Sequence, residues 1–301
     1  MGIVVLGTVA LDSVKTPHGS QKNMLGGSAA HFSMSARLFA KVHLAAVVGE
    51  DFPAQHIDLF RRRGIDVSSL RKEKGSTFKW EGEYRHDDLN TACTLNTELG
   101  VLTCAFPRLD EAQRRIKSVF LANYDPELQY QFLKEMQQPA FVGLDTMNFW
   151  IHNKRSALEK IMKKAHLLVL NDAEARDLSL ENNALTAARA LTKYGPRMVI
   201  VKKGEHGALF YSRDCTFALP AFPLAAVVDP TGAGDTFAGG VMGYLAKAGK
   251  LTPTHLRRAI AYGTIAASYN VQGFGMQKTA AMAMADVRAR FTEYVRFFKF
   301  S

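Results

Sequence analysis

Apolar residues along this chain gather in short runs that alternate with segments of helical spacing. Strands are predicted near residues 3–9, 42–48, 118–122, 140–145 and 167–171. Between the later runs, residues 126–137 and 153–164 carry apolar positions at the spacing of a helix. Strands that alternate with helices form parallel sheets covered by helices. The pattern therefore predicts an α/β fold, a three-layer sandwich with a mostly parallel central sheet.

Residues 75–103 break this pattern and predict a separate small sheet. Phe78, Trp80 and Tyr84 alternate with polar residues, which is the period of two of a strand with one apolar face. Residues 91–97, rich in threonine, predict an antiparallel neighbour. Because an aromatic face on a small sheet cannot bury itself alone, it must cover the substrate, the main body or a partner chain. We expect core packing or a dimer contact, with stacking against a bound base as the alternative.

The most informative stretch is 227–240, Val-Val-Asp-Pro-Thr-Gly-Ala-Gly-Asp-Thr-Phe-Ala-Gly-Gly. It predicts the end of a strand, a glycine turn and a helix whose first turn contains Asp235. Amide groups at a helix start carry partial positive charge, so Gly232, Ala233 and Gly234 form a candidate cradle for a phosphoryl group. The helix terminus favours the ionised form of Asp235, a candidate general base for phosphate transfer to an alcohol. The alternative is a glycine turn whose aspartate only caps the helix.

The spacing of the glycines excludes two other nucleotide-binding motifs. The sequence contains no Walker run of the form G-x-x-x-x-G-K-[ST]. The dinucleotide fingerprint requires a third glycine where this chain has Phe237, and the motif lies far from the first predicted strand. A dinucleotide-dependent oxidoreductase is therefore disfavoured.

The composition is that of an ordinary globular protein: of 301 residues, 47% are hydrophobic and 22% are charged. No run of about 18 apolar residues occurs, so we expect no transmembrane helix and no membrane partner. The N-terminus lacks the basic start and cleavage site of a signal peptide. Cys93, Cys104 and Cys215 have no metal-ligand spacing. These features predict a reduced, cytoplasmic protein.

A formal net charge of +10 raises the question of a nucleic-acid partner. The basic residues are scattered along the chain, however, and we find no RNA-binding or helix-turn-helix signature. A generally basic surface that attracts anionic nucleotides is the simpler explanation. We therefore expect no nucleic-acid partner.

The run from Asp229 to Gly240 closely resembles the second signature of the ribokinase (PfkB) family of sugar and nucleoside kinases. The resemblance covers essentially the whole chain and implies one ribokinase-like kinase domain over residues 1–301. It also implies a discontinuous β lid contributed by about residues 12–22 and 75–103. In the family such a lid covers the substrate and often pairs with the lid of a second subunit. A homodimer through the lid is therefore expected.

The same resemblance implies a site for the acceptor molecule near the first strand. Asp12 follows that strand, and a carboxylate can accept hydrogen bonds from two adjacent sugar hydroxyls, although the residue alone would equally fit a turn. Gly26 and Gly27 look like the start of the family's first signature. His31 stands where the family has asparagine, and it either contacts substrate or packs in its helix. Asn148 is a further candidate because ligands bind beyond the carboxyl ends of parallel strands.

Residues for ATP and metal ions follow from the resemblance as well. Asn171 and Glu174 resemble the Asn-x-x-Glu motif linked to magnesium and phosphate, with magnesium held through water, and a helix capping box is the alternative. Asp229 is implied in a site for a monovalent cation such as potassium. The expected ATP-binding residues are Lys203, Gly204, Gly207, Thr231, Gly232, Gly234 and Asn270.

Together these residues predict an ATP-dependent kinase that phosphorylates a hydroxyl of a small sugar, with Asp235 as general base and the amides of residues 232–234 as anion hole. A sugar is expected ahead of a nucleoside because the candidate acceptor residues are mostly partners for hydroxyl groups. The nucleoside alternative rests on aromatic residues, among them Phe149 and Trp150. A non-catalytic sensor on the same scaffold is a third interpretation.

Overall fold

The computed structural model describes residues 2–298, and its centre is a nine-stranded sheet in the order β13-β12-β11-β10-β9-β8-β1-β4-β5. The bounds are β1 Gly2–Leu6, β4 Lys41–Gly49, β5 Leu70–Glu73, β8 Ser118–Leu121, β9 Phe141–Asp145, β10 Leu167–Asn171, β11 Met198–Lys202, β12 Ala208–Ser212 and β13 Thr216–Leu219. Neighbours run parallel from β11 to β5, and β12 and β13 extend the edge antiparallel. The predicted mostly parallel central sheet is confirmed.

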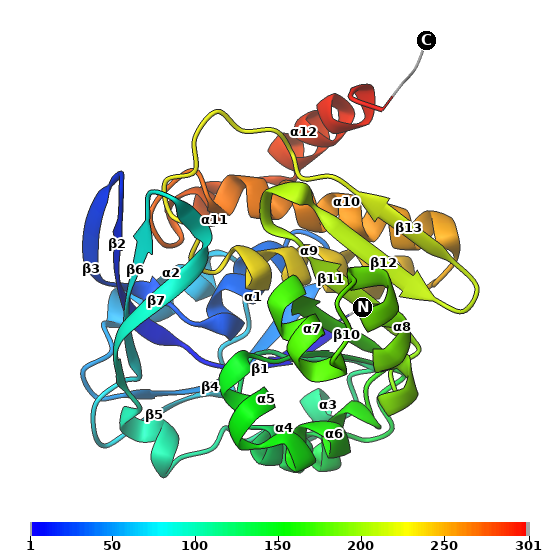
Figure 1. Cartoon of the computed structure of the whole chain (residues 1–301). Coiled ribbons are helices and arrows are strands. Elements are labelled where there is room, and N and C mark those ends of the chain that lie inside the picture. The colour runs from blue at the N-terminus through cyan, green and yellow to red at the C-terminus, as the bar shows by residue number, and fades with distance from the viewer. Residues whose placement is uncertain (1, 299–301) are drawn as a thin grey trace.

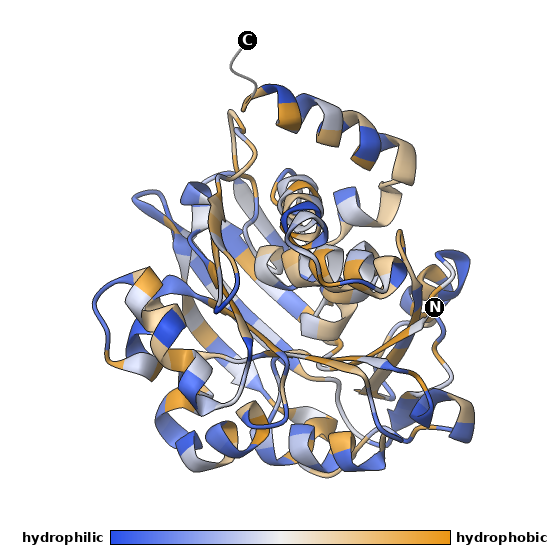
Figure 2. Ribbon diagram, turned by 90° about the vertical axis from the view of Figure 1, so that its right-hand side faces the viewer, coloured by the Kyte–Doolittle hydropathy of each residue, from blue (hydrophilic) through white to orange (hydrophobic). Residues whose placement is uncertain are grey.

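Helices cover both faces of this sheet, which completes the predicted three layers (Figures 1 and 2). One face carries α1 Ser28–Ala36, α2 Ala54–Arg62, α9 Ala233–Ala248, α10 Pro253–Asn270 and α11 Gln277–Ala281, with α12 Met284–Arg296 packed outside α10. The other carries α3 Glu111–Arg114, α4 Pro126–Glu135, α5 Asn148–Asn153, α6 Arg155–Met162, α7 Asp172–Ser179 and α8 Ala184–Leu191. Within the described residues, no helix combines the length and apolar character needed to cross a membrane.

The double covering explains why the central strands are apolar without interruption. In β1, Ile3 and Val5 belong to one core, whereas Val4 and Leu6 belong to the core on the opposite face. All four side chains are completely buried. A strand that alternates between two buried faces needs an apolar residue at every position, which is the pattern of the predicted strands.

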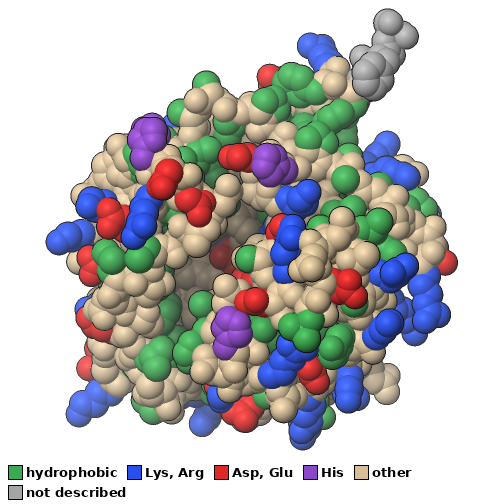
Figure 3. All heavy atoms as spheres, viewed as in Figure 1, with side chains coloured by type: hydrophobic (Ala, Val, Ile, Leu, Met, Phe, Trp, Pro, Cys, Tyr) green, Lys and Arg blue, Asp and Glu red, His purple; other side chains and the backbone are tan. Residues whose placement is uncertain are grey.

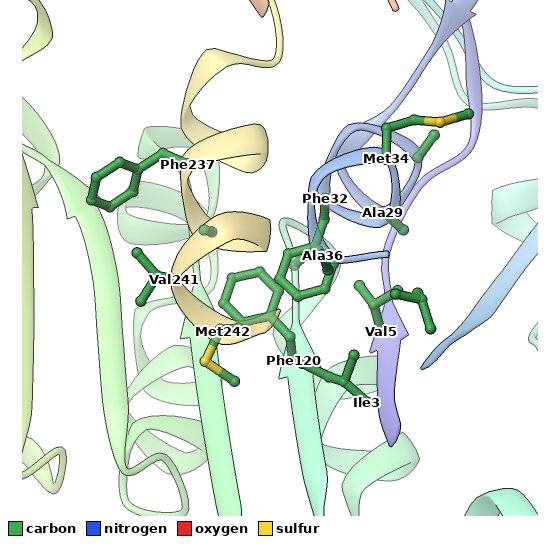
Figure 4. Packing of buried hydrophobic residues seen from close by; sticks show 14 of the residues in the cluster. Ile3, Val5, Ala29, Phe32, Met34, Ala36, Phe120, Phe237, Val241 and Met242 are labelled. Carbon is green, nitrogen blue, oxygen red and sulfur yellow. The ribbon is translucent and has the colours of Figure 1, made fainter. Parts of the chain in front are cut away.

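Helix α9 packs closely against α1 because it carries small residues on the contacting face (Figure 4). A β-carbon at Gly239 would overlap the carbonyl of Phe32, and one at Gly243 would lie 2.9 Å from the Cα of Ala36. The rings of Phe32 and Phe120 stack below this contact with centroids 4.5 Å apart. The start of α9 is thereby fixed to a rigid part of the fold.

The small sheet consists of β2 Ala10–Thr16, β3 Gly19–Gly26, β6 Lys79–Arg85 and β7 Asp88–Glu98, in the order β3-β2-β6-β7. β2 and β6 pair in parallel, whereas β2–β3 and β6–β7 are antiparallel hairpins. The antiparallel strands predicted within residues 75–103 are confirmed by β6 and β7, and the two hairpins join side by side through β2 and β6, which run in the same direction. The sheet stands beside the main body, next to the carboxyl end of β1 (Figure 1).

One local expectation differs from the structure. Val227 and Val228 do not end a strand, because residues 220–232 are irregular. The amide of Val228 donates to the carbonyl of Val271 over 2.7 Å, and Thr16 donates to the carbonyl of Val228 over 2.8 Å. This backbone is thus held by a loop and by the small sheet. Asn148 lies beyond the carboxyl end of β9, as expected, and begins the short helix α5.

Candidate active site

The loop before α9 has the backbone form expected of an anion-binding turn. Gly232 is the residue preceding the helix, and its φ of 72° lies in the left-handed region that favours glycine. The amide of Ala233 donates to the carbonyl of Pro230 over 3.1 Å. Within residues 2–298, the amides of Gly232 and Gly234 have no backbone or side-chain acceptor. These two amides are therefore free to bind an anion.

A buried polar network supports this turn from below. The amide nitrogen of Asn270 donates to the carbonyl of Thr231 over 2.7 Å, so the side-chain oxygen of Asn270 faces the other way. That oxygen accepts from the hydroxyl of Thr236 at 3.0 Å and lies 3.1 Å from Nδ1 of His31. Because this oxygen can only accept, Nδ1 must carry the proton. Nε2 of His31 is then an acceptor, and it is buried with no partner among the described residues.

The imidazole ring of His31 also lies directly against the backbone of Gly232. A β-carbon at Gly232 would overlap three atoms of the ring. Burial lowers the pKa of His31 to about 4, so the ring is neutral at physiological pH. His31 therefore packs under the turn, and its buried Nε2 has no hydrogen-bond partner among residues 2–298.

Asp12 lies at the opposite side of the site, on β2. Its carboxylate accepts from the amide of Gly27 over 3.3 Å, and a β-carbon at Gly26 would overlap that carboxylate. Burial raises the pKa of Asp12 to about 7, and the charges of Asp229 and Asp235 act in the same direction. The structure thus brings together Asp12 and the two glycines that the sequence assigned to the acceptor.

Asp229 ties the turn to a second loop. One carboxylate oxygen accepts from the amide of Thr231 and the other from the amide of Gly275, each over 2.9 Å. The residue is completely buried. Asp229 therefore fixes the backbone around the anion-binding turn.

A cluster of charged side chains lies beyond the turn, where β9, β10 and β11 end. The ammonium group of Lys202 donates to Asp145 over 3.2 Å. Glu174 and Asn171 form a capping box at the start of α7, in which the glutamate accepts from the Asn171 amide over 2.7 Å. Parallel strands bring these residues to one edge of the sheet because their carboxyl ends coincide.

The surroundings raise the pKa values of two carboxyl groups in this cluster. Burial raises the pKa of Asp235 to about 7, the charge of Asp145 adds to this rise, and Lys202 opposes it. Burial likewise raises the pKa of Glu174 to about 7, again opposed by Lys202. Groups with pKa values near the working pH are suited to accept and release protons.

The small sheet reaches the anion-binding turn through Tyr84. This side chain is 8% exposed, and the hydroxyl of Thr231 donates to its oxygen over 3.4 Å. Asn90, near the tip of the same hairpin, contacts Gly204. Of the aromatic face, Tyr84 is thus buried against the main body, whereas Phe78 and Trp80 remain partly exposed. Figure 3 shows the site as a hollow between the small sheet and helices α5 and α7, with an acidic side chain in its depth.

The remaining predicted residues lie around this hollow or at its rim. Lys203 is exposed, and its amide donates to the carbonyl of Gly207 over 2.7 Å. Gly204 and Gly207 have φ values of 54° and 87°, so both need the freedom of glycine. Asn148 is exposed at the start of α5 and makes no side-chain hydrogen bond within residues 2–298.

Sequence reasoning missed three residues of the site: Asp145, Lys202 and Asn123. Asp145 and Lys202 each end a buried strand, and a charged residue in that position was an available signal. The carbonyl of Asn123 accepts from Ser28 at the start of α1 over 3.1 Å, and its side chain accepts from the Trp150 indole over 2.8 Å. Nothing in the sequence pattern indicates Asn123.

The chain is similar to known kinases over nearly its whole length. A model of the pfkB family of carbohydrate kinases matches residues 3–281. A cytidine kinase from Thermococcus kodakarensis is 30% identical over 252 residues, which cover 80% of this chain and 87% of that protein.

Solved structures show the same fold. The aminoimidazole riboside kinase of Salmonella enterica superposes with a TM-score of 0.78 at 19% identity, covering 97% of this chain and 100% of that one. A nucleoside kinase of Methanocaldococcus jannaschii, an archaeal member of the ribokinase family, gives 0.77 at 22% identity and covers 97% and 98% of the two chains. The expected ribokinase-like fold is confirmed.

Proposed function

Because this chain belongs to the pfkB family of carbohydrate kinases, we propose that it transfers the terminal phosphoryl group of ATP to a hydroxyl group of a nucleoside. The observation that carries the proposal is the position of Asp235 in the first turn of α9, beside the free amides of Gly232 and Gly234. A carboxylate next to an anion cradle is what phosphoryl transfer to an alcohol requires.

Each residue of the site has a separate role in the proposed reaction. Asp12 accepts hydrogen bonds from acceptor hydroxyls, and Nε2 of His31 accepts one more. Asp235 takes the proton of the attacking hydroxyl as its oxygen bonds to the terminal phosphorus and the bond from that phosphorus to ADP breaks. The amides of Gly232 and Gly234 hold the phosphoryl oxygens during this step. The small sheet excludes water through Tyr84.

A nucleoside is favoured over a free sugar by the surface next to the acceptor residues. Asn123 joins the start of α1 to Trp150, and the neighbouring Met147 and Phe149 are 38% and 52% exposed. An exposed aromatic and thioether surface beside the ribose position suits a stacked base. The similarity to a cytidine kinase supports the same choice and reverses the order expected from the sequence.

A free sugar is the second candidate, because Asp12, Gly27 and His31 provide polar partners for a ribose without regard to its base. The two are separated by measuring ADP release with cytidine, adenosine and inosine against ribose and fructose. A nucleoside kcat/KM at least about tenfold above every sugar, or ~1.4 kcal/mol, is expected. A sugar above every nucleoside would contradict the choice.

Changing Phe149 tests the stacking surface itself. Phe149→Ala is expected to lower kcat/KM for the best nucleoside by about tenfold and to leave any sugar activity within about twofold. Leu180→Ala, at an 85% exposed site, is the control and should change neither. Equal losses for nucleosides and sugars would show that Phe149 does not read the base.

Kinases of this family use ATP with a divalent metal, and we propose magnesium. Within residues 2–298, no group of three histidine, cysteine, aspartate or glutamate side chains could hold a metal. The residues therefore fit an ion held mainly by ATP phosphates and water, with Glu174 reached through water. When bound, magnesium neutralises charge on the phosphates.

We also propose a potassium ion near Asp229, whose buried negative charge the ion would offset. Activity in potassium should exceed activity in a large organic cation at equal ionic strength. Equal rates would contradict this part of the proposal.

Finally, we propose a homodimer formed through the small sheet. Tyr84 of the apolar face that first suggested it is buried within the chain, so the main support comes from β7. This edge strand is exposed along most of its length, and Leu95 and Leu99 are 54% and 52% exposed. Exposed edges of this kind pair with other strands unless they are protected.

A reduced, cytoplasmic setting is proposed from the three free cysteines.

A further inference from the structure

Lys202 is a largely buried cation, with its side chain 18% exposed, that lies directly against the anion-binding turn. It ends β11, and its ammonium nitrogen lies 3.2 Å from a carboxylate oxygen of Asp145. A β-carbon at Gly234 would lie 2.9 Å from that nitrogen. The glycine therefore keeps open a space in which the ammonium group adjoins the backbone of the turn.

The ammonium group has more N–H donors than it has acceptors nearby. It carries three N–H groups, and Asp145 is the only side chain within residues 2–298 that accepts from it. The free amide of Gly234 belongs to the residue that the ammonium group touches. An anionic oxygen bound by this amide would thus lie within reach of a second donor from Lys202.

The charge of the surroundings requires such a cation. Asp145, Glu174 and Asp235 place three carboxyl groups in the cluster, and Lys202 is the cation that offsets the burial of the last two. A phosphoryl group that enters brings further negative charge. Burial alone would lower the pKa of Lys202, but the carboxylates outweigh burial and raise it, so the group keeps its proton.

We propose that Lys202 is a catalytic residue that binds the terminal phosphoryl group of ATP, and that Asp145 holds the ammonium group in place for this contact. The inference rests on the proposed function. Because Lys202 ends a strand at the centre of the fold, its charge is fixed before the substrate arrives, and no reorganisation is needed during transfer. Stability alone does not explain a buried ion pair, since a protein with apolar residues in the same place is often equally stable.

The test compares Lys202→Met, Lys202→Arg and Asp145→Asn with the wild type. Lys202→Met is expected to lower kcat by about 100-fold to 1,000-fold, the range for the loss of one donor to a transition-state oxyanion. Asp145→Asn should lower kcat by less than about tenfold, because the amide oxygen of asparagine can still accept a hydrogen bond from the ammonium group and keep it beside Gly234. Lys193→Met is the matched control, since Lys193 is exposed and precedes the opposite end of β11.

Thermal unfolding of each variant shows whether a loss of kcat comes from a loss of structure. Lys202→Met leaves the buried Asp145 carboxyl group without its cation, so the double variant Lys202→Met/Asp145→Asn is measured as well. It should fold like the wild type and show the same loss in kcat as Lys202→Met. If the double variant, or Lys202→Met itself, kept kcat within about threefold, the inference would be overturned. An equal loss of kcat in Asp145→Asn and Lys202→Met would also overturn the inference, because the pair would then act only as a structural unit.

Calorimetry with ATP and ADP separates this inference from the proposed function. If Lys202 binds the terminal phosphoryl group, Lys202→Met should weaken ATP binding by about tenfold and leave ADP binding within about threefold. Lys202→Arg should lose less than Lys202→Met. Equal losses for both nucleotides would overturn the inference even if the enzyme is an active kinase. A normal ATP preference in the wild type without turnover on any acceptor would refute the proposed function alone.

Discussion

At the scale of single residues, the site is built from carboxyl groups held where water is scarce. Asp12, Glu174 and Asp235 all have pKa values raised to about 7, in each case mainly by burial. Each one is protonated more readily in the folded chain than in the unfolded chain. Their contribution to stability is therefore present below about pH 4 and is lost as the pH rises through about 7. Keeping these carboxylates in the site therefore lowers the stability of the fold at neutral and higher pH.

Replacing Asp235 should separate activity from stability. Asp235→Asn removes the proton acceptor, so kcat should fall by roughly 100-fold or more. It also removes a charge that is unfavourably buried, so the free energy of unfolding at pH 8 should rise by about 1 kcal/mol, or roughly 2 °C in Tm. Asp58→Asn, at an exposed residue of α2, is the control and should change neither quantity. Near-normal turnover in Asp235→Asn would exclude this residue as the base.

The pH dependence of activity follows from the same shift. Asp235 must be ionised to accept a proton, so kcat/KM should increase with pH up to about 7 and level off above it. An unperturbed aspartate would give a plateau from about pH 5. The measurement is the initial rate between pH 5 and 9 at saturating ATP. A flat profile across pH 5–7 would contradict a raised pKa for the base.

At the scale of structural elements, the turn before α9 depends on contacts from distant parts of the chain. His31 from α1 and Asn270 from α10 both support it, and Asp229 joins it to the loop at Gly275. The glycines of the turn and Asp235 were predictable because their spacing is local. The supporting network was not, because it depends on how α1, α9 and α10 pack.

The contact between His31 and Gly232 can be tested with a matched pair of glycines. Gly232 and Gly64 have similar φ values of 72° and 75°, but a β-carbon at Gly64 would meet nothing within 4 Å. Alanine at either position costs about 1–2 kcal/mol of backbone strain. Only Gly232→Ala should also displace the His31 ring and lower kcat by at least about tenfold. Similar kcat values in the two variants would show that the ring does not position the turn.

The charged pair of Lys202 and Asp145 illustrates the limit of local reasoning. The two residues are 57 positions apart, and they meet because β9, β10 and β11 are neighbours in the sheet. The order of strands is a property of the whole fold, so no spacing along the chain predicts the pair. The small sheet shows the same limit, since β2 and β6 pair in parallel across a long stretch of sequence.

At the scale of the whole molecule, the layered architecture was the most predictable feature. Strands buried on both faces leave continuous apolar runs, and these runs are visible in the sequence. The covering of Tyr84 by the main body was not visible, because the same alternation of residues is expected for a face that meets a partner chain. The dimer proposal has to be tested directly for this reason.

The test of the dimer uses an exposed residue of β7. Sedimentation of the wild type at micromolar concentration should show a dimer, and Leu95→Glu should shift it to a monomer without lowering Tm by more than about 2 °C. Leu180→Glu, at a more exposed position outside the small sheet, should leave the dimer intact. A monomeric wild type would contradict the proposal.

The central claim is that this chain moves a phosphoryl group from ATP to a nucleoside hydroxyl with Asp235 as base. Phosphorus NMR of a mixture of the enzyme, ATP, magnesium and cytidine tests it most directly, because it reports both products at once. We predict ADP and a nucleoside monophosphate in equal amounts, and neither product with Asp235→Asn under the same conditions. Release of ADP with free phosphate and no nucleoside monophosphate, from cytidine or from adenosine and inosine in its place, would contradict the claim.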